Sequence, residues 1–152
     1  LPQQSPTGRR CDMKTEQRVY ITYRLERASG TRTEARALLG MGHLRGAVNR
    51  IYYACFYAVS ALLLCEGRSS SKHTGLRALF NCEWVKTGRV GPDMGAFYNA
   101  LFDNRQEADY EDLATFDLAE VQVWFDTAVA FVAEITKRVE RQLSEDAEPP
   151  PQ

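Results

Sequence analysis

Apolar residues recur at helical spacing along most of the chain. Between residues 16 and 41 the spacing alternates between four and three positions, as in Ile21, Leu25, Ala28, Ala35 and Leu39. This period places apolar side chains on one face of a helix. The pattern therefore predicts a first amphipathic helix over Glu16–Met41.

The second apolar run is the most regular in the chain. It begins at Leu44 and ends at Cys65, and Gly67 follows as a C-cap. Three small residues spaced seven apart accompany it, at Ala47, Ala54 and Ala61. Because helix separation depends on the size of the side chains at the contact, another helix can approach this one closely.

Three further helices complete the pattern. Two are short, at Thr74–Trp84 and Asp93–Asn104, and Pro92 suits the start of the second of these. The last is long and ends at Leu143, and Asp117 and Glu120 form a capping-box pattern at its start. No strand-like alternation interrupts the series. The sequence predicts an all-α fold, an antiparallel helical bundle of about five helices.

The two ends of the chain differ in character from the bundle. Residues 1–15 are mostly polar and lack periodicity, which favours a disordered leader. Residues 144–152 combine acidic residues with three consecutive prolines, which cannot continue a helix and favour a disordered tail. The folded bundle is expected over residues 16–143.

The charges are balanced overall but unevenly distributed. Nineteen Lys and Arg residues face twenty Asp and Glu residues, so the net charge favours no class of partner. Residues 1–50 carry ten basic and four acidic side chains, whereas residues 101–152 carry four and thirteen. We interpret this asymmetry as pairing between the two ends of the chain, with binding of a partner by the basic part as the alternative.

Cysteine spacing and hydropathy exclude several classes of protein. Cys11, Cys55, Cys65 and Cys82 form no C-x-x-C pair, so we expect reduced, buried thiols, no metal site and no cofactor. Apolar runs such as Ala58–Cys65 are shorter than a membrane span, and the N-terminus has no apolar signal core. These features predict a cytoplasmic protein without a membrane-spanning segment.

Five short motifs occur in an order that resembles a HEPN domain. They are Asn49–Phe56 (NRIYYACF), Ala61–Leu64 (ALLL), Ser71–Gly75 (SKHTG), Val85–Gly88 (VKTG) and Arg105–Tyr110 (RQEADY). The resemblance covers about Tyr23 to Phe131 and is to the prokaryotic branch often encoded beside a minimal nucleotidyltransferase. It implies a helical bundle that homodimerises. It also implies either a metal-independent toxin RNase or a non-catalytic module, associated with RNA or nucleotide and paired with a nucleotidyltransferase.

Catalytic HEPN proteins place an Arg and a His with four to six residues between them. A neutral His can take the proton of a ribose 2′-OH, and the guanidinium can bind the attacked phosphate. Arg105 matches the Arg, but Tyr110, Glu111 and Asp112 occupy the positions where His is expected. A phenol with a pKa of about 10 is a poor substitute for an imidazole with a pKa of about 6.5. The sequence therefore predicts an incomplete RNase site.

A different His can still reach Arg105 if successive helices alternate in direction. The loop after the second helix, the loop after the fourth and the start of the fifth then lie at one end of the bundle. That end gathers Lys72, His73, Arg105, Asp109 and Tyr110. We expect Lys72 and Arg105 to receive phosphate, Asp109 to orient Arg105 or His73, and His73 to transfer a proton.

Purely structural roles are open for the same residues. His73 can cap the turn before the third helix or bond a neighbouring carbonyl. Arg105 can pair with Asp109, with Tyr110 packed below the last helix, because such pairs often fix a conformation. The literal R-x4-H spacing from Arg68 to His73 falls outside the position of the family motif, so we attribute it to chance.

Two more groups of side chains have alternative interpretations. Asn49, Arg50 and Tyr53 share one helix face, where Asn49 and Arg50 can bind substrate, or the group can bond another helix or a second protomer. Five tyrosines would form a nucleic-acid stacking set if exposed, and otherwise are edges of the core: Tyr20, Tyr23, Tyr52, Tyr57 and Tyr98.

The leading interpretation is a HEPN component of a two-protein, toxin–antitoxin-like system with a minimal nucleotidyltransferase. It would act by RNA or nucleotide association without a complete RNase site. One alternative is a metal-independent ribonuclease toxin that uses Arg105 with His73 or Tyr110. Tyr110 could also accept a transferred nucleotide. A second alternative is a non-catalytic helical dimerisation module, which a cluster buried in mutual salt bridges would favour.

Overall fold

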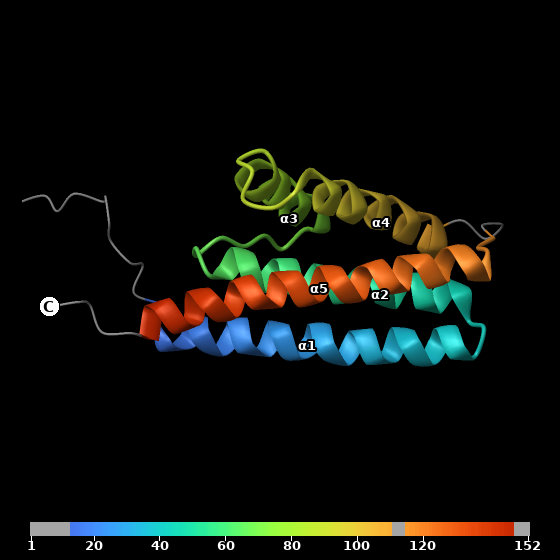
Figure 1. The fold of residues 1–152 in the computed structure, drawn as a ribbon, viewed down its shortest axis with the longest axis horizontal. Coiled ribbons are helices and arrows are strands. Elements are labelled where there is room, and N and C mark those ends of the chain that lie inside the picture. The colour runs from blue at the N-terminus through green and yellow to red at the C-terminus, as the bar shows by residue number, and fades with distance from the viewer. Residues whose placement is uncertain (1–12, 111–114, 148–152) are drawn as a thin grey trace, which may run out of the picture.

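The computed structural model describes residues 13–110 and 115–147, and these residues are helical with short connections (Figure 1). The elements, in order, are α1 (Thr15–Gly40), α2 (Leu44–Leu64), α3 (His73–Phe80), the π-helical turn η1 (Asn81–Val85), α4 (Pro92–Tyr110) and α5 (Leu118–Ala147). No strand occurs in the described part of the chain. The predicted all-α class is confirmed.

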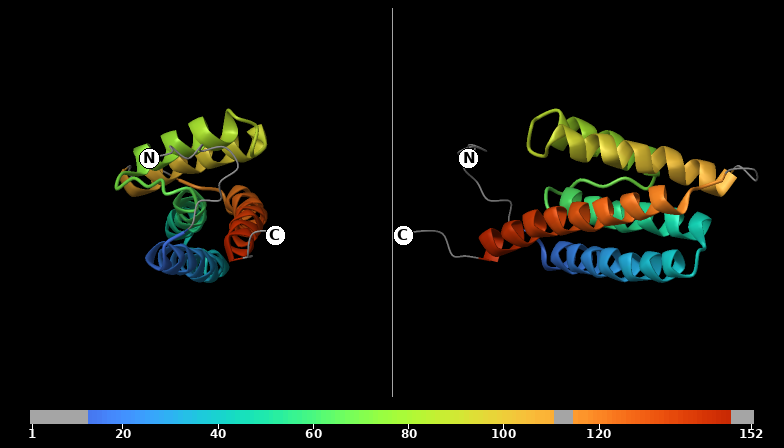
Figure 2. Two further views of the ribbon diagram at one scale, coloured as in Figure 1. Left: turned by 90° about the vertical axis from the view of Figure 1, so that its left-hand side faces the viewer. Right: turned by 45° about the vertical axis from the view of Figure 1, so that its right-hand side comes forward.

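The helices form a long bundle with a smaller layer on one side. α1, α2 and α5 run side by side, and α3 and α4 lie across α2 on the face away from α1 (Figures 1 and 2). α2 is the central helix, since it packs against α1, α4 and α5. The site described below lies where α2, α3 and α4 meet.

The apolar pattern of α2 reflects this central position. Ala47, Ala54 and Ala61 are each at most 2% exposed, as expected for a stripe that neighbouring helices approach closely. Among the helices described, α2 alone is long and apolar enough to cross a membrane by length and composition. However, 61% of its most apolar window is buried inside the bundle, which is typical of a core helix.

The glycine predicted to cap α2 adopts the conformation that this role needs. Gly67 has a φ of 68°, in the left-handed region that favours glycine. The amide of Arg68 donates to the carbonyl of Leu63 over 2.9 Å and closes the turn. This hydrogen-bond pattern is that of a Schellman motif, and it ends the helix as predicted.

Two helices are longer than their apolar patterns predict. α4 ends at Tyr110 rather than at Asn104, because Arg105 and Ala108 continue its buried face past Leu101. Their spacing from Leu101 is helical, but an arginine does not register in an apolar pattern. α5 ends at Ala147 rather than at Leu143, so residues 144–147 are helical and not part of the expected tail.

The two ends of the folded chain are joined, as the charge asymmetry predicts. Arg18 of α1 forms an ion pair of 2.7 Å with Asp146 of α5. The same carboxylate accepts a hydrogen bond from the backbone amide of Met13 over 3.1 Å. Asp146 therefore binds both Arg18 in the first turns of α1 and Met13, two residues before the helix begins.

The cysteines only partly match the expectation of buried thiols. Cys55 and Cys65 are buried, and burial raises the pKa of both thiols, to about 12 for Cys65. Cys82 is exposed, so the expectation is wrong for this residue. Cys11 lies outside the described residues.

The path between α2 and α3 corrects the predicted topology. The end of α4 lies beside the start of α2, where Asn49 contacts Asp109, whereas α2 ends at the opposite end of the bundle (Figure 1). The loops after α2 and α4 are thus not at one end, as alternating helices would require. Residues 65–72 instead run back along α2, and His73 packs against Phe56 near the middle of that helix.

Candidate functional site

Polar side chains from α2, α3 and α4 meet in one cluster on the side of the bundle. We call it the polar cluster, and its members are Asn49 and Tyr53 of α2, His73 of α3, and Arg105 and Asp109 of α4. Four of these five residues were predicted site residues. The structure brings them together by the returning connection rather than by the end-to-end arrangement that the sequence predicted.

Arg105 is the most buried member of the cluster. The residue is only 9% exposed, and its Nε forms an ion pair of 2.8 Å with Oδ2 of Asp109, one helical turn later. Its Nη2 donates to the Tyr53 hydroxyl over 3.2 Å. The guanidinium also lies 5.5 Å from the ring centres of Tyr52 and Tyr53. These contacts hold the guanidinium in one place.

Asp109 is held from α2 as well as by Arg105. The side-chain amide of Asn49 donates to its Oδ1 over 2.9 Å. The carbonyl oxygen of Asn49 in turn accepts from Nη2 of Arg50 over 2.8 Å, and Arg50 lies 3.5 Å from Glu34. Asn49 therefore bonds across to another helix, which was one of its predicted roles. Arg50 is engaged within the protein through Asn49 and Glu34.

His73 contacts two tyrosine hydroxyls of α2. The Tyr52 hydroxyl lies 3.2 Å from Nδ1 and the Tyr53 hydroxyl lies 3.4 Å from Nε2. Each hydroxyl can donate to its ring nitrogen or accept from it, according to the tautomer of the imidazole. His73 neither caps the turn nor bonds a carbonyl, so those structural interpretations are wrong.

The surroundings of His73 favour its neutral form. Burial lowers the pKa of the imidazole below its ordinary value, and the positive charge of Arg105 lowers it further. The Asp109 carboxylate acts in the opposite direction but is the smaller effect. A neutral imidazole next to a fixed guanidinium is the combination that proton removal beside a phosphate requires.

Two other predicted site residues lie outside the cluster. Tyr110 is 75% exposed at the end of α4, so it is neither in a loop nor packed below the last helix. Lys72 is exposed and directly precedes α3, with its backbone amide bonded to Ser70. Arg68 forms an ion pair of 2.6 Å with Glu83, away from His73, so its R-x4-H spacing has no structural counterpart.

Tyr53 is the member of the polar cluster that the sequence analysis placed on the right helix face but did not count among the candidate site residues. Its hydroxyl lies between Arg105 and His73 and joins them through two hydrogen bonds. The available signal was its place one turn after Asn49 and Arg50 on the same helix face. That spacing identified the face but not which hydroxyl would connect the other two groups.

No group of three or more metal-ligating side chains occurs in the described residues.

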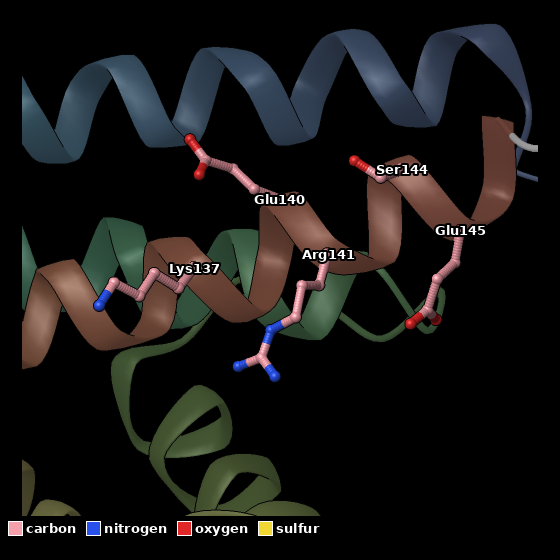
Figure 3. A pocket seen from close by; sticks show the side chains of 5 residues that line it. All are labelled: Lys137, Glu140, Arg141, Ser144 and Glu145. Atoms are coloured by element: carbon pink, nitrogen blue, oxygen red, sulfur yellow. The ribbon is translucent and has the colours of Figure 1, made fainter.

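A separate hollow lies along the second half of α5 and shares no residue with the polar cluster (Figure 3). It is lined by Lys137, Glu140, Arg141, Ser144 and Glu145, with Arg141 and Glu145 on one side of the helix and Glu140 toward α1. Two basic and two acidic side chains give it no net charge.

The fold and the site define a class: an all-α bundle with an Arg–Tyr–His connection between its central helix and two shorter helices. The HEPN domain family matches residues 21–142, which is most of the chain, and the chain belongs to this family. The predicted resemblance to a HEPN domain is thereby confirmed.

Two curated proteins are similar to this chain over different lengths. A Thermotoga maritima protein named "UPF0332 protein" is 46% identical over 125 residues, covering 82% of this chain and 95% of that protein. A Methanocaldococcus jannaschii protein named "Putative toxin MJ0142" is 40% identical over 65 residues, covering 43% of this chain and 44% of that protein.

Proposed function

We propose that this protein is the HEPN component of a two-protein, toxin–antitoxin-like system with a minimal nucleotidyltransferase. It acts by binding RNA or a nucleotide at the polar cluster. Membership of the HEPN family and the name of the M. jannaschii relative support a toxin-like role. The observation that carries the proposal is the convergence of Arg105 and His73 on the Tyr53 hydroxyl.

The contacts of Arg105 favour binding over efficient cleavage. Its Nε is paired with Asp109 and one of its terminal nitrogens is bonded to Tyr53, so a phosphate must approach the remaining donors. Both ring nitrogens of His73 lie against tyrosine hydroxyls, Nδ1 at 3.2 Å from that of Tyr52 and Nε2 at 3.4 Å from that of Tyr53. A substrate 2′-OH can therefore pass its proton to His73 only by way of one of these tyrosines or after displacing it.

A metal-independent ribonuclease is the second candidate, favoured by the lowered pKa of His73. In that reaction the 2′-OH loses its proton to the imidazole, directly or through Tyr53, and the 2′ oxygen forms a bond to phosphorus. The bond from phosphorus to the 5′ oxygen breaks, and the leaving oxygen takes a proton. The products are a 2′,3′-cyclic phosphate and a free 5′-hydroxyl end, with Arg105 stabilising the charge on the phosphate.

A metal-free RNA assay tests both candidates. Wild type, Arg105→Ala and His73→Ala are incubated with cellular RNA and with a labelled short RNA. The control is Arg68→Ala, which removes the Arg of the literal R-x4-H spacing but lies apart from the cluster. The proposal is supported if wild type binds RNA without cleaving it, if Arg105→Ala weakens this binding at least about tenfold, and if Arg68→Ala leaves it unchanged.

Two other outcomes are informative. Cleavage that is lost in both Arg105→Ala and His73→Ala would establish the ribonuclease instead. If folded wild type neither binds nor cleaves RNA, both candidate functions are contradicted and the helical dimerisation module remains.

The partners belong to the same proposal. We propose a homodimer and a complex with a minimal nucleotidyltransferase, as the family resemblance implies. Co-expression with such an enzyme and co-purification through a tag on one protein checks the complex. Sedimentation of this chain alone checks the dimer, and a monomer that captures no nucleotidyltransferase would contradict this part of the proposal.

A further inference from the structure

Two tyrosines and two arginines lie within two turns of α1, and the arginines border Tyr57 of α2. We call this set the arginine–tyrosine strip, and its members are Tyr20, Tyr23, Arg24 and Arg27 of α1 and Tyr57 of α2. Tyr20 and Tyr23 are 61% and 52% exposed, and each lies one helical turn before one of the arginines. Of the five tyrosines considered as stacking residues, these two are exposed and Tyr57 is half-buried, whereas Tyr52 and Tyr98 are core.

The arginines of the strip are held over an aromatic ring. The guanidinium carbons of Arg24 and Arg27 lie 5.7 Å and 5.1 Å from the centre of the Tyr57 ring. Nη2 of Arg27 also donates to the Tyr57 hydroxyl over 3.3 Å. A guanidinium held in this way keeps donors for a phosphate and a flat face on which a base can stack.

The strip is continuous with the polar cluster. The rings of Tyr57 and Tyr53 lie on α2 with their centres 6.1 Å apart, and Tyr53 contacts both Arg105 and His73. Arg50 lies 5.0 Å from the centre of the Tyr53 ring at the other side of this row. From Arg50 to Tyr57 the helix advances about 10 Å, which is the length of about three stacked bases.

The charge of the strip suits a polyanion. Arg24, Arg27 and Arg50 are basic, and the acidic Glu34 lies 3.5 Å from Arg50 and also acts on the charge of Arg27. A second acidic residue, Glu26, lines a shallow hollow on α1 together with Tyr23. Exposed aromatic rings with interspersed arginines are the combination that single-stranded nucleic acid binds. A duplex keeps its base faces stacked inside and cannot use the tyrosines in this way.

We propose that the arginine–tyrosine strip is a binding surface for single-stranded RNA that extends the polar cluster. The inference rests on the proposed function, because it assigns the neighbouring part of the same ligand. Bases stack on Tyr20 and Tyr23 and on the Arg27 guanidinium, and Arg24 and Arg27 contact phosphates. The cluster alone holds a dinucleotide, and the strip adds affinity only for a longer strand.

Fluorescence anisotropy with probes of different length tests the strip. The probes are a labelled dinucleotide, a single-stranded RNA of about 12 nucleotides and a duplex of the same length. The test variant is Arg24→Gln/Arg27→Gln. The matched control is Arg32→Gln/Arg36→Gln, which makes the same charge change on the same helix but on the face toward α5, where Arg36 lies against Phe125.

RNA binding by the strip predicts that the test variant loses affinity for the long single strand only. The test variant should bind the strand of about 12 nucleotides about tenfold more weakly and leave dinucleotide affinity unchanged. The slope of the logarithm of its binding constant against the logarithm of salt concentration should be smaller in magnitude by about 1.4, since each phosphate contact on a single strand contributes about 0.7. The control variant should match wild type on all probes. Tyr23→Ala should weaken binding of the same strand, and Tyr23→Phe should not.

Three results would contradict RNA binding by the strip, and they distinguish this failure from a failure of the proposed function. If wild type binds both single-stranded probes and the test variant matches the control, the strip is wrong and the cluster stands. If wild type binds neither probe, both inferences fail. If the test variant changes the sedimentation of the protein and not its RNA affinity, the strip contacts another protein chain.

Discussion

Arg105 of α4 donates a hydrogen bond of 3.2 Å to the hydroxyl of Tyr53 of α2. The same hydroxyl lies 3.4 Å from Nε2 of His73, so one oxygen joins the guanidinium to the imidazole. The three residues come from three helices and are far apart in the sequence. Their contact makes α2 the structural support of the site and gives Tyr53 a central position between the other two groups.

Tyr53→Phe should destabilise the protein by about 1 to 3 kcal/mol, because it leaves a donor of the buried Arg105 without its partner. Tyr57→Phe is the control, since it removes a hydroxyl whose partner, Arg27, is only half-buried, and it should destabilise the protein less than Tyr53→Phe. Urea unfolding of both variants measures the difference. Equal stabilities would mean that the Tyr53 hydroxyl does not hold Arg105.

The Arg105–Asp109 ion pair should contribute more than a surface pair. Its side chains are 11% and 26% exposed, so a double-mutant cycle with Arg105→Gln and Asp109→Asn should give a coupling of about 1 to 3 kcal/mol. The comparison is the pair Arg77–Asp103, whose atoms are 3.8 Å apart and whose aspartate is 70% exposed. That cycle should give less than about 1 kcal/mol. Equal couplings would contradict the buried character of the site.

Acid should destabilise the fold through His73. The unfolded chain binds a proton at the ordinary pKa of 6.5, whereas the folded protein, whose His73 pKa is lowered, stays neutral there. The free energy of unfolding should therefore fall as the pH drops below about 6.5, until the folded pKa is reached. His73→Gln should reduce this dependence. Urea titrations between pH 5 and 8 measure it, at about half-unit steps.

Two glycines should respond to alanine with opposite signs. A Cβ at Gly95 would lie 2.8 Å from a methyl of Val85, so Gly95→Ala should cost about 1 to 3 kcal/mol by overpacking. Gly30, in the middle of α1, has nothing within 4 Å of that position, and Gly30→Ala should stabilise by about 0.4 to 1 kcal/mol. Thermal unfolding compares the two, and a stable Gly95→Ala would refute the close packing of α4 on η1.

The helices could be predicted from the sequence because their buried positions are occupied mainly by apolar side chains at helical spacing. The prediction failed at the end of α4, where Arg105 occupies a buried position that the pattern treats as polar. The site itself was predicted for the wrong reason. His73 and Arg105 were expected at one end of the bundle, yet they meet because residues 65–72 return along α2. Periodicity carries no information on the direction of such a polar connection.

The role of Tyr53 also depends on three-dimensional detail. Its helical spacing from Asn49 and Arg50 identified a polar face of α2, but hydroxyl contacts with two other helices become visible only after they pack. Tyr110 shows the converse. It was a candidate because of its position in a motif, and the structure places its side chain in solvent, 75% exposed.

The most direct test of the site follows the His73 imidazole by NMR while a short single-stranded RNA is added without metal. The chain contains two histidines, and His43, exposed in the turn between α1 and α2, is an internal reference. A site at the polar cluster predicts saturable shifts of the His73 signals with little change at His43, and loss of those shifts in Arg105→Gln. If the RNA leaves the His73 signals unchanged, the cluster does not bind RNA and the central claim is contradicted.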